Sequence, residues 1–153
     1  MCKQMNRLLS VVVLAALLLC LYVPSFAADD PQAAPHFDQI LVETAVDGTS
    51  ARGEVVTIYG HKNYTAYDTN GTAVWRMTLT GTFTYDGSSS SCTGASLSFT
   101  AYDSAYYKVS GNAYPSGSSA VADFTVGFRV LGITVATTNH HMVLSCDANG
   151  NLS

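Results

Sequence analysis

The histidines are the first candidates for a chemical role in this chain, and that role would be metal binding. His140 and His141 are neighbours, and adjacent residues on a β-strand point to opposite faces, so their rings cannot bind one ion together. His61 or His36 could join either ring only through the tertiary fold. Residues 147–151 (DANGN) resemble the start of a calcium loop, but no glutamate stands at its twelfth position. The sequence predicts no metal site and no cofactor.

Catalytic motifs are also missing from the sequence. The chain has no Gly-x-Ser-x-Gly motif, which would place a serine nucleophile on a sharp turn. Paired carboxylates for glycoside hydrolysis must face one groove, and only the tertiary fold could bring the scattered candidates together. These candidates are Asp68, Asp86, Asp103 and Asp123. We therefore expect a protein that is not an enzyme.

Two cysteines are expected to form a disulfide. Of the four in the chain, Cys2 and Cys20 lie in the N-terminal segment described below, which leaves Cys92 and Cys146 in the domain. Neither belongs to a Cys-x-x-Cys pair, so zinc binding is disfavoured. Two cysteines in an exported chain are typical of one stabilising disulfide bond.

The abundance of tyrosine is the feature of the composition that says most about ligand binding. Nine tyrosines accompany many serines, threonines and glycines, and this mixture is common on binding surfaces because tyrosine offers rigid amphipathic contact area. Plain β-strand propensity is the alternative explanation. We expect one turn at Gly60 and another at Asp103-Ser104. Tyrosines near these turns are the expected ligand contacts, namely Tyr64, Tyr67, Tyr102, Tyr106 and Tyr107.

The N-terminal segment has the layout of a signal peptide. Lys3 and Arg7 precede an apolar run at residues 8–23, Pro24 ends that run, and small residues precede a cleavage position after Ala27 or Ala28. The run is shorter than the about 20 residues of a membrane-spanning helix, although an uncleaved anchor is the alternative. We expect a signal peptide at residues 1–27, a flexible lead-in at 28–36 and one domain at 37–153.

Alternating apolar and polar residues indicate the elements that must position these side chains. Alternation runs through residues 75–85, 120–130 and 133–146, and a period of two indicates half-buried strands. Asp47-Gly48, Asn70-Gly71 and Asp86-Gly87 are typical of tight turns. The runs near 39–46, 53–59, 63–68, 72–85, 94–102, 105–112, 119–130 and 133–146 predict an all-β, antiparallel β-sandwich of about eight strands.

Two positions stay ambiguous in this strand pattern. Gly132 is either a turn that separates two strands or a bulge within one long strand. Residues 39–46 suit a strand, but their apolar Ile40, Leu41 and Val42 would also fit one helical turn.

Length and charge exclude several classes of protein. The 153 residues suit one domain. Seven basic residues against eleven acidic ones give a formal charge of −4, so the basic surface of a nucleic-acid-binding protein is missing. Charged residues make up 12% and hydrophobic ones 48% of the chain, which excludes a disordered acidic tail and a coiled coil.

Three segments carry a resemblance to a protein group: residues 75–93 (WRMTLTGTFTYDGSSSSCT), 130–135 (VLGITV) and 144–153 (LSCDANGNLS). In these segments the chain resembles small secreted β-rich proteins of Gram-positive gut anaerobes, a group with no assigned function. The resemblance covers the C-terminal half and both domain cysteines. It implies export and a β-rich fold, and it supplies no catalytic residue.

These observations together predict a secreted, extracellular binding module for a glycan, a cell-wall polymer or a protein. We expect no nucleic-acid partner and no stable membrane insertion after signal cleavage. A secreted antagonist, such as a bacteriocin-like protein or a hydrolase inhibitor, is the second hypothesis. A small hydrolase is the third.

Overall fold

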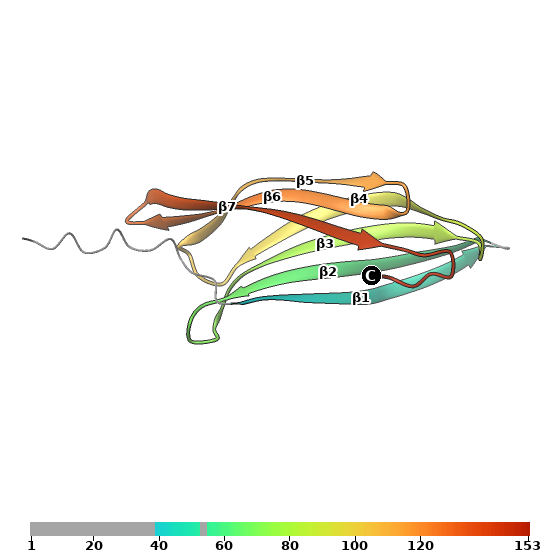
Figure 1. Ribbon diagram of the computed structural model, residues 1–153, viewed down its shortest axis with the longest axis horizontal. Helices are drawn as coiled ribbons and strands as arrows, with labels where there is room; N and C mark the ends of the chain where they lie inside the picture. The colour runs from blue at the N-terminus through green and yellow to red at the C-terminus, as the bar shows by residue number, and fades with distance from the viewer. Residues whose placement is uncertain (1–38, 53–54) are drawn as a thin grey trace, which may run out of the picture. The chain divides into compact units, whose positions relative to one another are not determined.

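The chain forms two antiparallel β-sheets (Figure 1). A computed structural model describes residues 39–52 and 55–153. Sheet A contains β1 (Gln39–Arg52), β2 (Val55–Tyr67), β3 (Ala73–Tyr85) and β4 (Ser90–Ala101), in that order. Sheet B contains β5 (Tyr106–Ser116), β6 (Ser119–Val130) and β7 (Ile133–Ser145), also in order. The described residues are therefore all-β, with successive strands paired as neighbours.

The alternation in the sequence decides which side chains of each strand enter the core. On β3, Trp75, Met77, Leu79 and Phe83 are fully buried, while the threonines between them are half-buried on the opposite face. β6 repeats this pattern with buried Ala120, Ala122, Phe124 and Val126. A period of two thus gives each sheet one apolar face.

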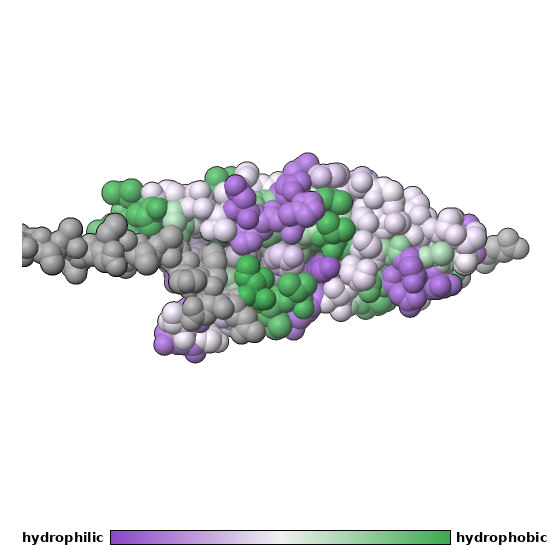
Figure 2. Space-filling model, viewed as in Figure 1, coloured by the Kyte–Doolittle hydropathy of each residue, from purple (hydrophilic) through white to green (hydrophobic). Residues whose placement is uncertain are grey.

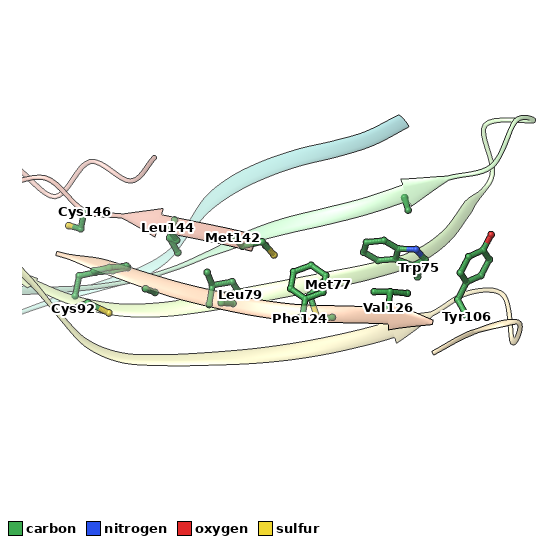
Figure 3. Packing of buried hydrophobic residues seen from close by; sticks show 14 of the residues in the cluster. Trp75, Met77, Leu79, Cys92, Tyr106, Phe124, Val126, Met142, Leu144 and Cys146 are labelled. Carbon is green, nitrogen blue, oxygen red and sulfur yellow. The ribbon is translucent and has the colours of Figure 1, made fainter. Parts of the chain in front are cut away.

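The two apolar faces share one hydrophobic core. Trp75 and Met77 of β3 lie near Phe124 and Val126 of β6, and the Trp75 and Phe124 rings meet edge to face at 6.3 Å (Figure 3). Met142 and Leu144 of β7 are also fully buried. Fully burying an aliphatic or aromatic side chain stabilises a fold by about 1.5–3 kcal/mol, so this cluster is the main source of stability.

Side chains of β2 connect sheet A to the edge strand β7. The Lys62 ammonium donates a hydrogen bond to the Val143 carbonyl oxygen at 2.8 Å, and the Tyr64 hydroxyl donates to the His141 carbonyl oxygen at 3.5 Å. Ser145 and Ser153 exchange two backbone hydrogen bonds of 3.0 Å each. The C-terminal residues therefore cover part of the β7 edge, which limits pairing with other strands there.

Turn chemistry explains where most strands end. Gly71, Gly87 and Gly132 have positive φ, as turns between strands require, so Asn70-Gly71 and Asp86-Gly87 form the predicted turns. Asp86 accepts hydrogen bonds from the Ser88 and Ser89 backbone amides, which lower the pKa of this carboxyl to about 2. Gly132 follows Leu131 in the turn between β6 and β7, which settles the first ambiguity.

Two sequence predictions about strands need correction. Seven strands are present in the described residues instead of about eight, because Gly60 lies inside β2 and does not separate two strands. Asp47-Gly48 is not a hairpin turn, because the pairing of β1 with β2 continues past it with a bulge between Val46 and Gly48. The predicted strand at residues 39–46 is confirmed, since these residues are strand throughout, which settles the second ambiguity.

The predicted signal peptide and lead-in lie outside the described residues, and the predicted domain at 37–153 is described from residue 39 except for residues 53–54. Within the described part of the chain, no helix is long and apolar enough to cross a membrane.

Candidate functional site

The outer face of sheet B, the side turned away from the core, carries polar side chains that form three groups of contacts. Alternation along each strand places them on this face, and the register aligns Asp123 of β6 with His141 of β7 and Thr125 with Asn139. We call this set the polar face: Tyr107, Tyr114, Asp123, Thr125, Asn139 and His141.

Asp123 is the centre of the polar face. One of its carboxylate oxygens lies 2.7 Å from His141 Nδ1, and the other accepts a hydrogen bond from the Tyr114 hydroxyl at 3.2 Å. The His141 hydrogen bond is the main cause that lowers the pKa of Asp123. The nearby Asp123 charge raises the pKa of Tyr114, so the tyrosine keeps its proton. The Asp123 and His141 side chains are 58% and 59% exposed, so both remain accessible to a ligand.

Tyr107 lies flat on the sheet because position 127 is a glycine. A Cβ atom built at Gly127 would approach the Tyr107 Cζ atom to 2.6 Å, so any larger residue would displace the ring. The Tyr107 and Thr134 hydroxyls share a hydrogen bond. The Arg129 guanidinium carbon lies 5.5 Å from the centroid of the Tyr107 ring, within cation–π range.

Hydrogen bonds and packing hold the remaining members of the polar face in place. Thr125 donates a hydrogen bond to the Asn139 side-chain oxygen at 2.8 Å across the two strands. Val121, which pairs with Tyr114, is 9% exposed although it lies on the outer face. Such side chains on paired strands are better fixed than side chains on loops.

The structure separates the five tyrosines that the sequence singled out. Tyr106 is only 7% exposed and packs on Phe128 in the core, so its ring is not available to a ligand. Tyr64 is half-buried against the core, and Tyr67 is half-buried at the end of β2. Tyr102 is 51% exposed in the loop after β4, with the Arg76 guanidinium 6.0 Å from its ring centroid. Only Tyr107 belongs to the polar face.

Sequence reasoning missed the other members of this face as ligand-binding residues. Alternation on β6 already placed Asp123, Thr125, Gly127 and Arg129 on one side of a strand. The missing information was register, because only the pairing of β5 and β7 with β6 brings Tyr114 and His141 to Asp123.

The two adjacent histidines point to opposite faces, as strand geometry predicts. His141 is on the polar face, whereas the His140 ring stacks on Phe124 at 5.0 Å and meets the Trp75 ring at 5.3 Å. Burial lowers the pKa of His140, so the inward imidazole is neutral. Among the described residues no group of three or more His, Cys, Asp or Glu side chains could hold a metal ion.

A second histidine–carboxylate pair lies on sheet A. His61 Nδ1 is 2.7 Å from an Asp47 carboxylate oxygen, and Asp47 is the residue at the β1 bulge. Like His141, His61 has no hydrogen bond to a hydroxyl or thiol among the contacts of the described residues. A serine-type triad needs a nucleophile hydrogen-bonded to its histidine, and neither pair shows that contact.

Cys92 and Cys146 are free thiols in the structure, and both are buried beside the turn between β5 and β6. The Cys92 amide donates to the Gly117 carbonyl oxygen at 2.8 Å, and the Cys146 amide donates to the adjacent Ser118 carbonyl oxygen at 3.0 Å. Burial raises the pKa of both thiols. Raised values are typical of structural cysteines and not of nucleophilic ones.

Comparisons of the chain with protein-family models, with curated proteins and with solved structures found no match.

Proposed function

We propose that this protein is an exported β-sandwich that binds an extracellular glycan or cell-wall polymer through the polar face of sheet B. The observation that carries the proposal is the Tyr114–Asp123–His141 network, with Tyr107 on the same face. The polar face is open to solvent at Asp123 and His141, whose side chains are both more than half exposed. An open face suits a long ligand that extends beyond a single pocket.

The chemistry of the polar face matches the chemistry of a sugar. Sugar hydroxyl groups both donate and accept hydrogen bonds, and this face offers a carboxylate, an amide, an imidazole and two phenols. The Tyr107 and Tyr114 rings add rigid amphipathic surface for the apolar side of a sugar ring. A few convergent polar groups beside aromatic rings are typical of small-molecule and cofactor sites.

Export and a disulfide are parts of the same proposal. The apolar run at residues 8–23 behind Lys3 and Arg7 supports export. Anchoring of the Cys92 and Cys146 amides to adjacent residues of one turn supports a bond between their sulfur atoms in an oxidising compartment. The intact mass of the exported protein, alkylated without reduction, tests both. A start at Ala28 or Asp29 with no alkyl group added is expected, and retention of residues 1–27 or two alkylated cysteines would contradict it.

Retention on insoluble polysaccharides tests the binding function. We expect purified protein to bind at least one of peptidoglycan, chitin, cellulose or starch, and Tyr114→Ala to reduce its affinity about 30-fold, since removing a central aromatic contact costs about 2 kcal/mol. Asp123→Asn should weaken binding as well.

The matched control for this experiment is Tyr59→Ala. Tyr59 is 43% exposed, close to the 40% of Tyr114, but it lies on sheet A. Circular dichroism should show all variants folded. Equal affinity of Tyr114→Ala, Asp123→Asn and the unmodified protein would refute the assignment of the polar face.

A further inference from the structure

The turn between β6 and β7 presents unusually exposed aliphatic side chains. Leu131 is 98% exposed, Ile133 is 69% and Val135 is 53%. We call these three residues the apolar tip. Figure 2 shows hydrophobic surface at the end of the β6–β7 hairpin. Exposed apolar residues that occur singly are ordinary, but a cluster at the end of a hairpin indicates a contact surface.

The backbone of this turn is unfavourable for leucine. Leu131 has a φ of 50° and Gly132 a φ of 82°, and Leu131 is the only residue other than glycine with positive φ in the described part of the chain. Two-residue hairpin turns of this kind favour Asn-Gly, because a branched hydrophobic side chain is strained in the left-handed region. Leu131 makes no packing contribution that would offset this strain, since its side chain is almost fully exposed. A strained and exposed residue is a reason to look for a functional contact.

The size of the apolar tip favours a lipid bilayer over a protein as its partner. A stable protein interface uses about 20–30 residues on each side, and the apolar tip has three. A bilayer needs no complementary pocket, so three aliphatic side chains can insert into it with weak and reversible affinity.

Residues at the base of the tip suit the polar boundary of a bilayer. Arg129 precedes the tip on β6, and its guanidinium donates to the Ser104 carbonyl oxygen in the loop after β4. The same loop carries Tyr102, which is half exposed. Tyrosine and arginine near an apolar segment are typical of side chains at the level of the lipid headgroups.

The chain enters the domain at the end that carries the tip. Gln39, the first residue of β1, pairs with Tyr67, the last residue of β2. The Val74 carbonyl oxygen near the start of β3 accepts from the Tyr102 and Asp103 amides, and Arg129 N donates to the Ala105 carbonyl oxygen. The start of β1 therefore lies at the same end of the domain as the apolar tip.

We propose that the apolar tip inserts into the headgroup–acyl boundary of a lipid bilayer and holds the exported protein at a membrane surface. The driving force is burial of Leu131, Ile133 and Val135, not charge. The full chain has a formal net charge of −4, and loss of Lys3 and Arg7 with residues 1–27 makes the exported protein more negative, so anionic lipid would repel it. The Tyr114–Asp123–His141 network lies farther along sheet B than the turn that carries the tip, so substitutions in the tip test lipid binding apart from glycan binding.

Sedimentation with phosphatidylcholine vesicles tests the proposal. The exported protein is used as it leaves the cell, with its N-terminus assigned by intact mass. We expect Leu131→Asn to reduce the vesicle-bound fraction about tenfold or more, as expected when one buried leucine side chain is lost. The same variant should melt at an equal or higher temperature, since Asn-Gly suits the turn. Loss of binding cannot then be caused by unfolding.

Val109→Asn is the matched control, because Val109 is 49% exposed on β5, away from the turn. Its vesicle binding should equal that of the unmodified protein. In a second measurement, Leu131→Trp should give fluorescence that brominated phosphatidylcholine quenches. The proposal is overturned by absence of vesicle binding, by equal binding of Leu131→Asn, or by binding that requires anionic lipid.

Discussion

At the scale of single residues, His140 shows how strongly the surroundings of a side chain decide its behaviour. Its neighbour His141 is exposed and hydrogen-bonded to Asp123, whereas the His140 Nε2 atom is buried without a hydrogen-bond partner. A buried unsatisfied polar atom costs about 1–3 kcal/mol. His140 is therefore a source of instability within a well-packed aromatic cluster.

Replacement of His140 by phenylalanine should stabilise the protein. The new ring would keep the contacts with Phe124 and Trp75 and remove the unsatisfied nitrogen, which should raise the free energy of unfolding by about 1 kcal/mol at pH 7. Urea denaturation measures this change. A less stable His140→Phe variant would contradict this explanation of His140.

The same substitution should flatten the dependence of stability on pH. Burial lowers the pKa of His140 in the folded protein from the ordinary value of 6.5. At a pH between the folded and the unfolded pKa of His140, the unfolded chain binds more protons than the folded protein. Unfolding therefore becomes easier as the pH falls below about 6.5. Melting temperatures at pH 7 and pH 5 should differ less in His140→Phe than in the unmodified protein.

At the scale of strands, Gly60 of β2 and Gly48 of β1 differ in the space that each leaves for a side chain. A Cβ atom at Gly60 of β2 would lie 2.2 Å from Leu152 Cδ1 and 2.7 Å from the Ala45 carbonyl oxygen. At Gly48 of β1 it would meet nothing within 4 Å. Gly60 is therefore required by the close approach of β1 and the C-terminal residues, not by a turn.

Alanine substitutions at Gly60 and Gly48 should have different effects on stability. Gly60→Ala should lower the free energy of unfolding by about 1–3 kcal/mol, because a backbone oxygen cannot move away as a flexible side chain can. Gly48→Ala should leave stability unchanged or increase it slightly, since it reduces the freedom of the unfolded chain. Equilibrium urea curves measure both. Equal stability of Gly60→Ala and the unmodified protein would contradict the packing of Leu152 against β2.

At the scale of the whole molecule, the cysteines can connect distant parts of the chain. A disulfide between Cys92 on β4 and Cys146 after β7 would join sheet A to the residue that follows sheet B. It would close a loop of about 55 residues, which corresponds to about 4 kcal/mol in the chain-entropy model. This amount is a large part of the free energy of unfolding of a small domain.

The disulfide hypothesis predicts a clear difference between oxidised and reduced protein. Reduction, or the double variant Cys92→Ala and Cys146→Ala, should lower the urea midpoint by an amount that corresponds to about 2–4 kcal/mol. The double variant should no longer respond to reductant, which controls for other effects of the reagent. Equal midpoints with and without reductant in the unmodified protein would contradict the bond.

Much of the fold could be predicted from the sequence because alternation is a local property. The buried faces of β3 and β6 follow directly from residues 75–85 and 120–130. Gly60 misled the prediction, because a glycine that permits close packing and a glycine that forms a turn look alike in sequence. The separate orientations of His140 and His141 were predictable, since strand geometry alone requires them.

By itself, the sequence determined the class of the fold, the apolar faces of β3 and β6, the acidic charge and the absence of the Gly-x-Ser-x-Gly and Cys-x-x-Cys motifs. Only the tertiary structure decided which residues from different strands meet. It buried Tyr106, placed Tyr114 and His141 beside Asp123, and exposed Leu131 in a strained turn. The physical reason is that periodicity fixes a side chain's face within its own strand, whereas register and sheet packing fix its neighbours across strands.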